Sequence, residues 1–243
     1  MSKKITILTP LKNNFSNNYL AVRDKENRVL TNDEVLQLPH LQAKNPNAKE
    51  WEARVSSTKR IITYLKNQTK PLDILDIGCG NGWFTHKLAQ IKNTQVTGID
   101  INLEELEQAN TVFNLENLEF VYGDIFQLQT LYAHKFDIIT LNASVQYFEN
   151  LEKLVVLLNS FLKENGEIHV MDSPFYSKNE IENAKKRTID YYSSQGFPEM
   201  ANYYFHHSLE DLNNYKIIHK PNRINRFITK NPFMHILLKK DSL

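Results

Sequence analysis

The sequence has almost no cysteine, since Cys79 is the only one in 243 residues. A single cysteine excludes an internal disulfide and a cysteine-rich zinc site. Long apolar runs are absent too, because none approaches the ~20 residues that a membrane-spanning helix needs. Residues 1–5 are not followed by an apolar core and a small-residue cleavage site, so they do not begin a signal peptide. We therefore expect a cytoplasmic protein with no membrane partner.

Net charge is nearly absent as well, since 29 Lys and Arg residues face 28 Asp and Glu residues, for a formal charge of +1. A chain without a basic excess has no global field that would recruit nucleic acid, which argues against RNA or DNA as a partner. Hydrophobic residues make up 41% and charged residues 23%, as in ordinary globular proteins. The length suits one large α/β domain with a small added cap.

Glycine is scarce, with seven in the chain, yet three of them fall within residues 78–82. Ahead of them, residues 72–77 form a short apolar run typical of a strand buried in a parallel sheet, and residues 83–91 follow as a helix. Glycines let the backbone turn tightly and approach a ligand, and the helix start directs free N–H groups at the same turn. This succession predicts a nucleotide-type site at the edge of an α/β sheet.

The glycine turn resembles motif I of the class I S-adenosylmethionine-dependent methyltransferases, an acidic residue followed by G-x-G-x-G. The acidic residue is Asp76, and the glycines are Gly78, Gly80 and Gly82. A dinucleotide-binding G-x-G-x-x-G would need its third glycine where the chain has Trp83. The resemblance implies S-adenosyl-L-methionine as cofactor and S-adenosyl-L-homocysteine as product. It also implies a Rossmann-like α/β fold, with seven mostly parallel strands in the order 3-2-1-4-5-7-6 and helices on both faces.

A second strand, residues 95–99, ends at Asp100, a position where the family carries a carboxylate. The resemblance implies that this carboxylate accepts hydrogen bonds from both ribose hydroxyls of the cofactor. Asp100 could instead cap the next helix. Asn102 suits the capping position better, with Glu105 three residues later completing a capping box.

Gly123-Asp124-Ile125 follows a third strand, residues 118–122. It resembles the family's step of glycine, aspartate and an apolar residue, in which Asp124 would accept the amino proton of adenine and Ile125 would lie against the ring. A turn aspartate after glycine is the structural alternative. Asp124 lies 24 residues after Asp100, the same spacing that separates Asp100 from the acid of the glycine turn, which marks successive strand ends at one sheet edge.

A helix is predicted over residues 47–67, and related methyltransferases often cross the methionine end of the cofactor with such a helix. Trp51, Arg54 and Ser57 share one of its faces because they are three residues apart. Arg54 pairs either with the cofactor carboxylate or with a neighbouring acid at the surface. The candidate cofactor contacts are Arg54, Asp76, Gly78, Cys79, Gly80, Gly82, Asp100, Ile101, Asp124, Ile125 and Asn142.

The fourth strand, residues 136–141, leads into the region in which the family brings the methyl group to its acceptor. The chain lacks the [D/N/S]-P-P-[Y/F] motif of enzymes that methylate nucleic-acid amines, and Asn142 stands where catechol-type enzymes have a metal-binding aspartate. Gln146-Tyr147-Phe148 is a loose counterpart of a loop in isoprenoid-quinone-type enzymes, which makes Tyr147 a candidate catalytic residue. Asp172-Ser173-Pro174-Phe175 follows the fifth strand instead, so we do not interpret it as an amine clamp.

Residues 173–213 are an insertion into the family's usual core, with a charged helix over residues 177–193 and six aromatic residues within residues 191–205. These rings predict either an aromatic cap over a small-molecule cleft or packing that fixes the insertion to the sheet. His206 and His207 are candidate catalytic residues, because a histidine can act as a general base near neutral pH. At most one of them faces a site, and without a third ligand they do not predict a metal centre.

The remaining elements are expected at residues 103–115 and 151–163 as helices, and at residues 167–171, 215–219 and 233–239 as strands. Asn165-Gly166 would end the second of these helices. Residues 1–46 form a lid or an edge decoration with a hairpin across residues 19–30, and residues 47–243 form the methyltransferase domain. The basic stretch 220–230 either grips an anionic substrate or is a solvated connection.

The motifs together predict an enzyme that transfers a methyl group from S-adenosyl-L-methionine to an oxygen or nitrogen of a small-molecule acceptor by in-line displacement. A general base helps when the acceptor is a hydroxyl or an ammonium, and it is dispensable when desolvation suffices. Two alternatives stay open: a methyltransferase that acts on a protein or tRNA, and a non-catalytic protein that binds the cofactor. A nicotinamide-dependent dehydrogenase is opposed by Trp83 and Asp124.

Overall fold

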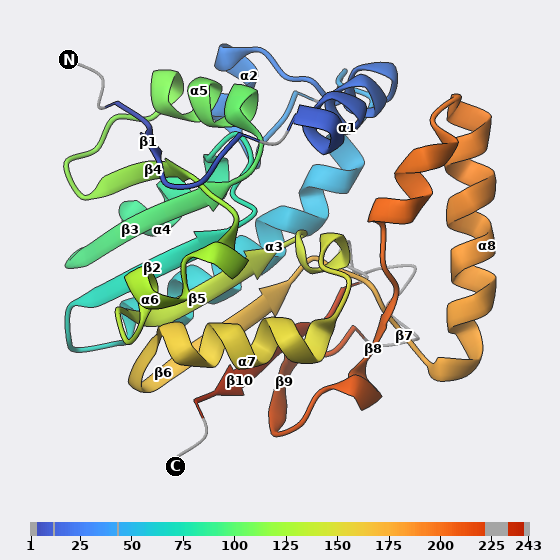
Figure 1. Cartoon of the computed structure of the whole chain (residues 1–243). Helices are drawn as coiled ribbons and strands as arrows, with labels where there is room; N and C mark the ends of the chain where they lie inside the picture. Colours follow the sequence, from blue (N-terminus) through green and yellow to red (C-terminus); the bar gives the residue numbers. More distant parts are fainter. Residues whose placement is uncertain (1–3, 12, 43, 222–232, 241–243) are drawn as a thin grey trace.

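A central sheet with helices on both faces makes up most of the protein (Figure 1). The computed structural model describes residues 4–11, 13–42, 44–221 and 233–240. Among these residues, no helix combines the length and the apolar character that crossing a membrane would require.

The main sheet has eight strands in the order β1-β4-β3-β2-β5-β6-β10-β9. In that order they are β1 (Thr6–Ile7), β4 (Leu118–Tyr122), β3 (Thr94–Asp100), β2 (Leu72–Ile77), β5 (Phe136–Asn142), β6 (Leu162–Met171), β10 (His235–Lys239) and β9 (Tyr215–His219). β1 to β6 pair in parallel, whereas β10 is antiparallel to both of its neighbours. Without β1 this is the predicted order, so the fold class is confirmed. The predicted strand count is one short because β1 adds an edge strand beside β4.

Helices pack on the two faces of this sheet in two separate groups (Figure 1). The first group is α3 (Ala48–Lys66), α4 (Trp83–Ala89) and α5 (Leu103–Val112), and the second is α6 (Gln129–Tyr132) and α7 (Leu151–Phe161). Along β2, Ile74 packs in the cluster of the first group, whereas Leu75 and Ile77 pack in the cluster of the second. Because successive strand residues point to opposite faces, a strand covered on both sides must be apolar throughout.

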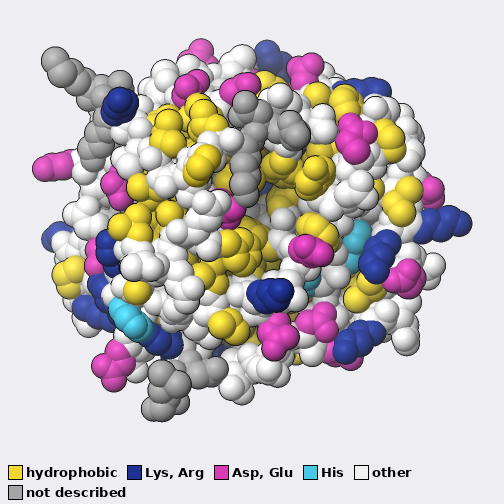
Figure 2. Space-filling view, in the orientation of Figure 1, with side chains coloured by type: hydrophobic (Ala, Val, Ile, Leu, Met, Phe, Trp, Pro, Cys, Tyr) yellow, Lys and Arg dark blue, Asp and Glu magenta, His cyan; other side chains and the backbone are white. Residues whose placement is uncertain are grey.

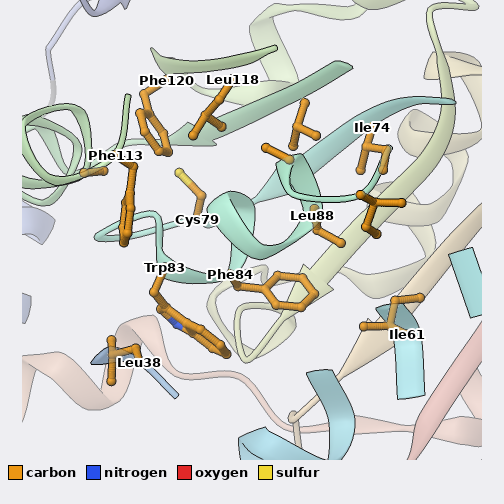
Figure 3. Packing of buried hydrophobic residues seen from close by; sticks show 14 of the residues in the cluster. Leu38, Ile61, Ile74, Cys79, Trp83, Phe84, Leu88, Phe113, Leu118 and Phe120 are labelled. Carbon is orange, nitrogen blue, oxygen red and sulfur yellow. The ribbon is translucent and has the colours of Figure 1, made fainter. Parts of the chain in front are cut away.

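Apolar side chains anchor the glycine turn from the core (Figure 3). Cys79 points toward Phe120 and Leu118, and the ring of Trp83, at the start of α4, lies 5.5 Å from that of Phe84 between ring centres. These contacts bury side chains on both sides of the turn, so its backbone is held in place against β3 and β4.

The N-terminal hairpin predicted across residues 19–30 is wrong, because α1 (Asn13–Lys25) is a helix. One side of α1 packs against Tyr192 and Met200, which belong to the insertion. The residues on this side are Phe15, Tyr19 and Val22, at helical spacing. This tertiary contact outweighs the polar, asparagine-rich composition, which by itself favours turns. A short helix, α2 (Asn32–Gln37), follows it and packs against α5.

The helix end predicted at Asn165-Gly166 is also wrong. α7 ends at Phe161 and β6 begins at Leu162, and both of these side chains are fully buried. Their burial against the sheet fixes the change from helix to strand at this point. The turn that Asn165-Gly166 makes lies inside β6, where Asn165 has a φ of 60°.

The insertion forms a separate cover at one end of the sheet (Figure 1). Its elements are β7 (Phe175–Tyr176), α8 (Lys178–Gln195), η3 (Pro198–Tyr203), β8 (His207–Ser208) and η4 (Leu209–Asp211), of which the η elements are 3₁₀ helices. β7 and β8 pair in parallel as a second small sheet. From residue 222 onward, the basic stretch 220–230 lies outside the described residues. The division into residues 1–46 and residues 47–243 stays a prediction.

Candidate functional site

Three of the protein's cavities lie where the parallel strands end, between the sheet and the helices α1 and α8, and Figure 2 shows hydrophobic side chains gathered around a hollow on this face. The glycine-turn cavity, about 110 Å³, is lined by residues 78–81, Glu50, Trp51 and Arg54 among others. The strand-end cavity, about 340 Å³, is lined by Asp100, Ile101, Asp124 and Ile125 among others. The tyrosine cavity, about 450 Å³, is lined by Arg187 and Tyr147, Tyr176, Tyr192 and Tyr204 among others.

Among the residues that the structure describes, two border all three cavities. They are Tyr19 of α1 and Ala143, which follows β5 and has a φ of 57°. The cavities therefore meet at one point, with the helix α1 on one side and the end of the central strand β5 on the other.

The glycine turn lies against the end of β3, and its backbone leaves no room for a side chain at Gly78. Gly78 has a φ of 69°, and a Cβ built on it would lie 2.5 Å from the Cβ of Ser144. The N–H groups of Gly78 and Cys79 donate to the carbonyl of Ile99 at 2.9 and 3.2 Å. This turn keeps a bare backbone edge on the glycine-turn cavity, which is the shape predicted from the sequence.

Asp76 supports this turn from within the core. Its carboxylate accepts hydrogen bonds from the hydroxyls of Thr85 at 2.6 Å and Thr140 at 2.8 Å. Burial raises its pKa to about 7. Both of its oxygens are engaged, so the structure gives Asp76 the role of fixing the turn to α4 and β5.

Two other candidates from the same motif also pack in the core, although Cys79 borders the glycine-turn cavity as well. Cys79 is buried, and burial raises the pKa of its thiol well above the usual range, so it is an unreactive packing residue. Gly82 begins α4 with a φ of 74°, and a Cβ there would meet Phe120 at 2.5 Å and Ala109 at 2.7 Å. Gly82 lets the helix approach the sheet closely and borders none of the three cavities.

Asp100 lies at the end of β3 with its carboxylate on the strand-end cavity. One oxygen accepts the N–H of Gly80 at 2.8 Å, and the other accepts the N–H of Asn102 at 2.9 Å. Burial raises its pKa. A carboxylate oxygen can accept more than one hydrogen bond, so a carboxylate held in this way keeps acceptor capacity for a ligand with two neighbouring hydroxyls.

Asp124 and Ile125 follow β4 and border the same strand-end cavity. The carboxylate of Asp124 accepts the N–H of Phe126 and the side-chain amide of Gln127, both at 3.1 Å, and so begins η1 (Ile125–Gln127). Ile125 is buried, and Ile101 borders the same cavity from the β3 side. Both isoleucines therefore present apolar surface to the strand-end cavity.

Arg54 and Asn142, two of the candidate cofactor contacts, both border the glycine-turn cavity. Arg54 donates to Glu50 at 2.7 Å, and its guanidinium lies 4.7 Å from the ring centre of Trp51. Among the described residues, the buried Oδ1 of Asn142 has no hydrogen-bond partner. A ligand with both an anionic and an N–H group would satisfy these two side chains.

Glu105 is a residue of this site that the sequence did not reveal. The predicted capping box forms only in part: Asn102 Oδ1 accepts the N–H of Glu105 at 3.3 Å, but the glutamate carboxylate does not return to the cap. It turns instead toward Gly80, where a Cβ would meet it at 3.2 Å. The capping pattern concealed this role, because it supplied a complete local explanation for the residue.

Tyr19 and Arg23 form a second feature that the sequence did not reveal. The Nε and one terminal nitrogen of Arg23 donate to the Tyr19 hydroxyl at 3.0 and 2.9 Å. Burial raises the pKa of Tyr19 well above its usual range. In the hairpin predicted for this region, Tyr19 and Arg23 would lie about 13 Å apart along an extended strand, so only a helical periodicity of aromatic residues could have indicated the pair.

Of the candidate catalytic residues, the structure brings Tyr147 alone to the cavities. Its ring lies 5.7 Å from Tyr19 and 6.0 Å from Tyr204, and burial raises its pKa. His206 shares a hydrogen bond of 2.9 Å with Thr188, and the buried His207 lies 3.2 Å from the carbonyl of Val145. Neither histidine borders the three cavities. The described part of the chain contains no group of side chains suited to a metal ion.

A family model described as a methyltransferase domain matches residues 68–237 of the chain. The chain is 33% identical over 126 residues to the malonyl-[acyl-carrier protein] O-methyltransferase of Acetivibrio thermocellus, covering 49% of this chain and 44% of that protein. It is 27% identical over 178 residues to the protein of that name from Halalkalibacterium halodurans, covering 70% of this chain and 66% of the relative. The matches thus span less than two thirds of these relatives' lengths.

Solved structures share the fold at low sequence identity. The YcgJ protein of Bacillus subtilis has a TM-score of 0.58 and 18% identity, covering 78% of this chain and 100% of that one. An S-adenosylmethionine-dependent methyltransferase from Mesorhizobium loti has a TM-score of 0.54 and 14% identity. The match covers 79% of this chain and 97% of that one.

Proposed function

Because the chain belongs to the methyltransferase-domain family, whose model matches residues 68–237, we propose that it is an S-adenosylmethionine-dependent methyltransferase acting on an oxygen or nitrogen of a small-molecule acceptor. The observation that carries this proposal is the meeting of the three cavities at Tyr19 and Ala143. Two cavities suit the two ends of the cofactor, and the third suits an acceptor.

The residues present fit the cofactor. The diol of the ribose matches the carboxylate of Asp100, and the adenine ring matches the apolar surface that Ile101 and Ile125 present to the same cavity. The amino acid end matches Arg54 and the unpartnered amide oxygen of Asn142 on the glycine-turn cavity. The absence of a Cβ at Gly78 and Gly80 leaves the backbone accessible between these two ends.

When bound, S-adenosylmethionine supplies a methyl group on a sulfonium, an electrophile with its own leaving group. The protein must hold the acceptor atom in line with that methyl group and exclude water. The rings of Tyr19, Tyr147 and Tyr204 enclose the meeting point of the cavities from α1, η2 (Val145–Tyr147) and the insertion. With pKa values raised by burial, Tyr19 and Tyr147 remain neutral phenols that orient an acceptor by hydrogen bonding.

An acceptor that reaches the site already as a nucleophile suits this cavity best. Burial raises the pKa of Tyr19 and Tyr147 at the meeting point, so both stay protonated and offer no phenolate to take a proton from the acceptor. Arg23 and Arg187 border the tyrosine cavity and provide positive charge beside it. The names of the relatives favour an oxygen atom as the acceptor. A base role for His206 or His207 stays a prediction, since both lie outside the cavities.

Calorimetric titration with S-adenosylhomocysteine tests the cofactor half of this proposal. The wild-type protein should bind with micromolar affinity, and Asp100→Ala should weaken binding by about a hundredfold, since it removes a charged acceptor of ligand hydrogen bonds. Asp190→Ala, at an exposed carboxylate on α8, is the matched control and should bind like the wild type. Lack of wild-type binding would overturn the proposal.

The acceptor half is tested by the formation of S-adenosylhomocysteine in the presence of small carboxylic acids, phenols and amines. Methyl transfer to one of them should fall when Tyr147 is changed to Phe, while affinity for the cofactor product stays within about twofold. Turnover with a protein or tRNA substrate, and with none of the small molecules, would contradict the small-molecule assignment.

A further inference from the structure

We propose that Glu105 is a further cofactor-contact residue, whose carboxylate favours the positively charged S-adenosylmethionine over the neutral S-adenosylhomocysteine. The inference rests on the proposed function, because it concerns the same cofactor cavities. It assigns to one side chain of this chain a selectivity between substrate and product.

The position of Glu105 places it between the two ends of the bound cofactor. It lies in the first turn of α5 and borders both the glycine-turn and the strand-end cavity. The other residues that border both are Tyr19, Gly78, Gly80 and Ala143. A ligand that fills both cavities must pass these residues with its middle, and the sulfonium is in the middle of S-adenosylmethionine.

The carboxylate of Glu105 has no local partner that would explain its inward orientation. Among the described residues, no hydrogen bond or ion pair is made by its oxygens, and the capping box that would have used it does not form. The Glu105 side chain is half-buried, so its carboxylate is only partly hydrated, and a cation that enters the cavities would be attracted to it.

Around Glu105, acidic side chains outnumber basic ones. Asp100 faces it from β3, Arg23 and Tyr19 face it from α1, and Tyr147 faces the same space from η2. The two tyrosines are neutral, so two carboxyl groups are opposed by one guanidinium, whose N–H groups already donate to Tyr19. Burial, with the neighbouring charge of Asp100, raises the pKa of Glu105 to about 7.

Proton release follows from this arrangement. In the free protein Glu105 carries a proton in part of the molecules at neutral pH, and a sulfonium beside it would favour the ionised form. Binding of S-adenosylmethionine should therefore release a proton below pH 7, and its affinity should rise with pH. S-adenosylhomocysteine has the same amino acid and adenosine ends without the sulfonium charge, so its affinity should change little.

The experiment is calorimetric titration with S-adenosylmethionine and with S-adenosylhomocysteine at pH 6, 7 and 8. For the wild type, the affinity for S-adenosylmethionine should rise about tenfold from pH 6 to pH 8, while that for S-adenosylhomocysteine changes less than about twofold. Glu105→Gln should remove this rise and bring the two affinities together. Glu104→Gln, at the exposed neighbouring glutamate, is the matched control and should behave like the wild type.

The outcomes separate this inference from the proposed function. If the wild type binds S-adenosylhomocysteine but shows no pH-dependent preference, the cofactor assignment stands and the role of Glu105 is overturned. If Glu105→Gln weakens both ligands equally, the residue binds hydroxyls or supports the fold, which also overturns the charge selectivity. Lack of binding of either ligand to the wild type contradicts the proposed function itself. Retained affinity of Glu105→Gln for S-adenosylhomocysteine shows that the variant is folded.

Discussion

The two sides of the site are built in different ways. The sheet side, the turns that follow β2, β3 and β4, is fixed by backbone hydrogen bonds, such as those from Gly78 and Cys79 to the carbonyl of Ile99. The cover side, formed by α1, α8 and η3, is held by ring contacts, such as that of Phe15 with Tyr203 at 5.3 Å.

This difference separates two tasks. Buried turns with satisfied backbone groups have few alternative conformations, so the sheet side is formed before a ligand arrives. Ring contacts between distant segments of the chain can open locally while the sheet stays intact. We therefore expect changes on the sheet side to abolish cofactor binding, and changes on the cover side to alter how tightly a ligand is enclosed.

Gly78→Ala should have the largest effect. The new Cβ would lie 2.5 Å from the Cβ of Ser144, whose hydroxyl is itself held by the carbonyl of Ile77 at 2.7 Å. Strain at positive φ and this overlap together should lower the free energy of unfolding by about 3 kcal/mol. Denaturant unfolding measures the loss, and calorimetry should show that S-adenosylhomocysteine no longer binds.

Gly196→Ala on the cover side is the matched control for that change. Gly196 ends α8 with a φ of 84°, but a Cβ there would have no atom nearer than Lys25 Nζ at 3.9 Å. Only the backbone strain remains, about 1 kcal/mol, and cofactor binding should persist. Equal losses for the two variants would mean that the close approach of Ser144 is not what makes the glycine turn rigid.

Acid should weaken the central sheet, away from the site, through a buried histidine pair. His169 Nδ1 and His235 Nε2 lie 2.9 Å apart between β6 and β10, and both side chains are fully buried. Burial, with the neighbouring His169, lowers the pKa of His235 to about 3, whereas an unfolded histidine titrates near 6.5. The unfolded state therefore binds the proton first, so stability is complete above pH 6.5 and is lost as the pH falls toward 3.

The size of this effect between pH 7 and pH 5 is about 2 kcal/mol for His235. The free energy of unfolding should fall between pH 7 and pH 5 in both proteins. The fall should be about 2 kcal/mol larger in the wild type than in His235→Gln. His40→Gln, at an exposed histidine, should keep the full difference. An equal pH dependence in wild type and His235→Gln would show that His235 is not the source.

Phe15→Ala should loosen the cover side without melting the sheet. The Phe15 ring contacts Tyr19, Tyr147 and Tyr203 at 5.3 to 5.9 Å, and Phe15 also borders the strand-end cavity. Loss of this half-buried ring should reduce stability by about 1–2 kcal/mol and affinity for S-adenosylhomocysteine by about tenfold. Limited proteolysis should become faster within α1, whereas the exposed Val29→Ala should leave both properties unchanged.

The sheet side could be predicted from the sequence because each of its residues is determined within a short segment. The apolar run before Gly78 fixes a buried strand, the glycines fix the turn, and Asp100 ends the next strand. Gly82 shows the limit of this method. The motif made it a candidate cofactor contact, whereas in the structure it lies against Phe120 and borders none of the three cavities.

The cover side could not be predicted, because its residues depend on partners far away in the chain. α1 becomes a helix where Phe15 and Tyr19 meet rings of the insertion, and no local pattern contains that information. His206 and His207 illustrate the same limit: their chemistry was visible in the sequence, but the turn of the insertion that places them outside the cavities was not. Glu105 was hidden for a different reason, since a capping motif gave it a sufficient local role.

Tyr191→Phe should have the smallest effect and decides what holds the cover side together. The Tyr191 hydroxyl of α8 donates to Glu26, just after α1, but the tyrosine side chain is exposed. Water competes for such a bond, so its removal should cost less than about 0.5 kcal/mol and leave the affinity for S-adenosylhomocysteine unchanged. Thermal unfolding and calorimetry measure both. A loss as large as that of Phe15→Ala would mean that a polar latch, and not ring packing, closes α8 onto α1.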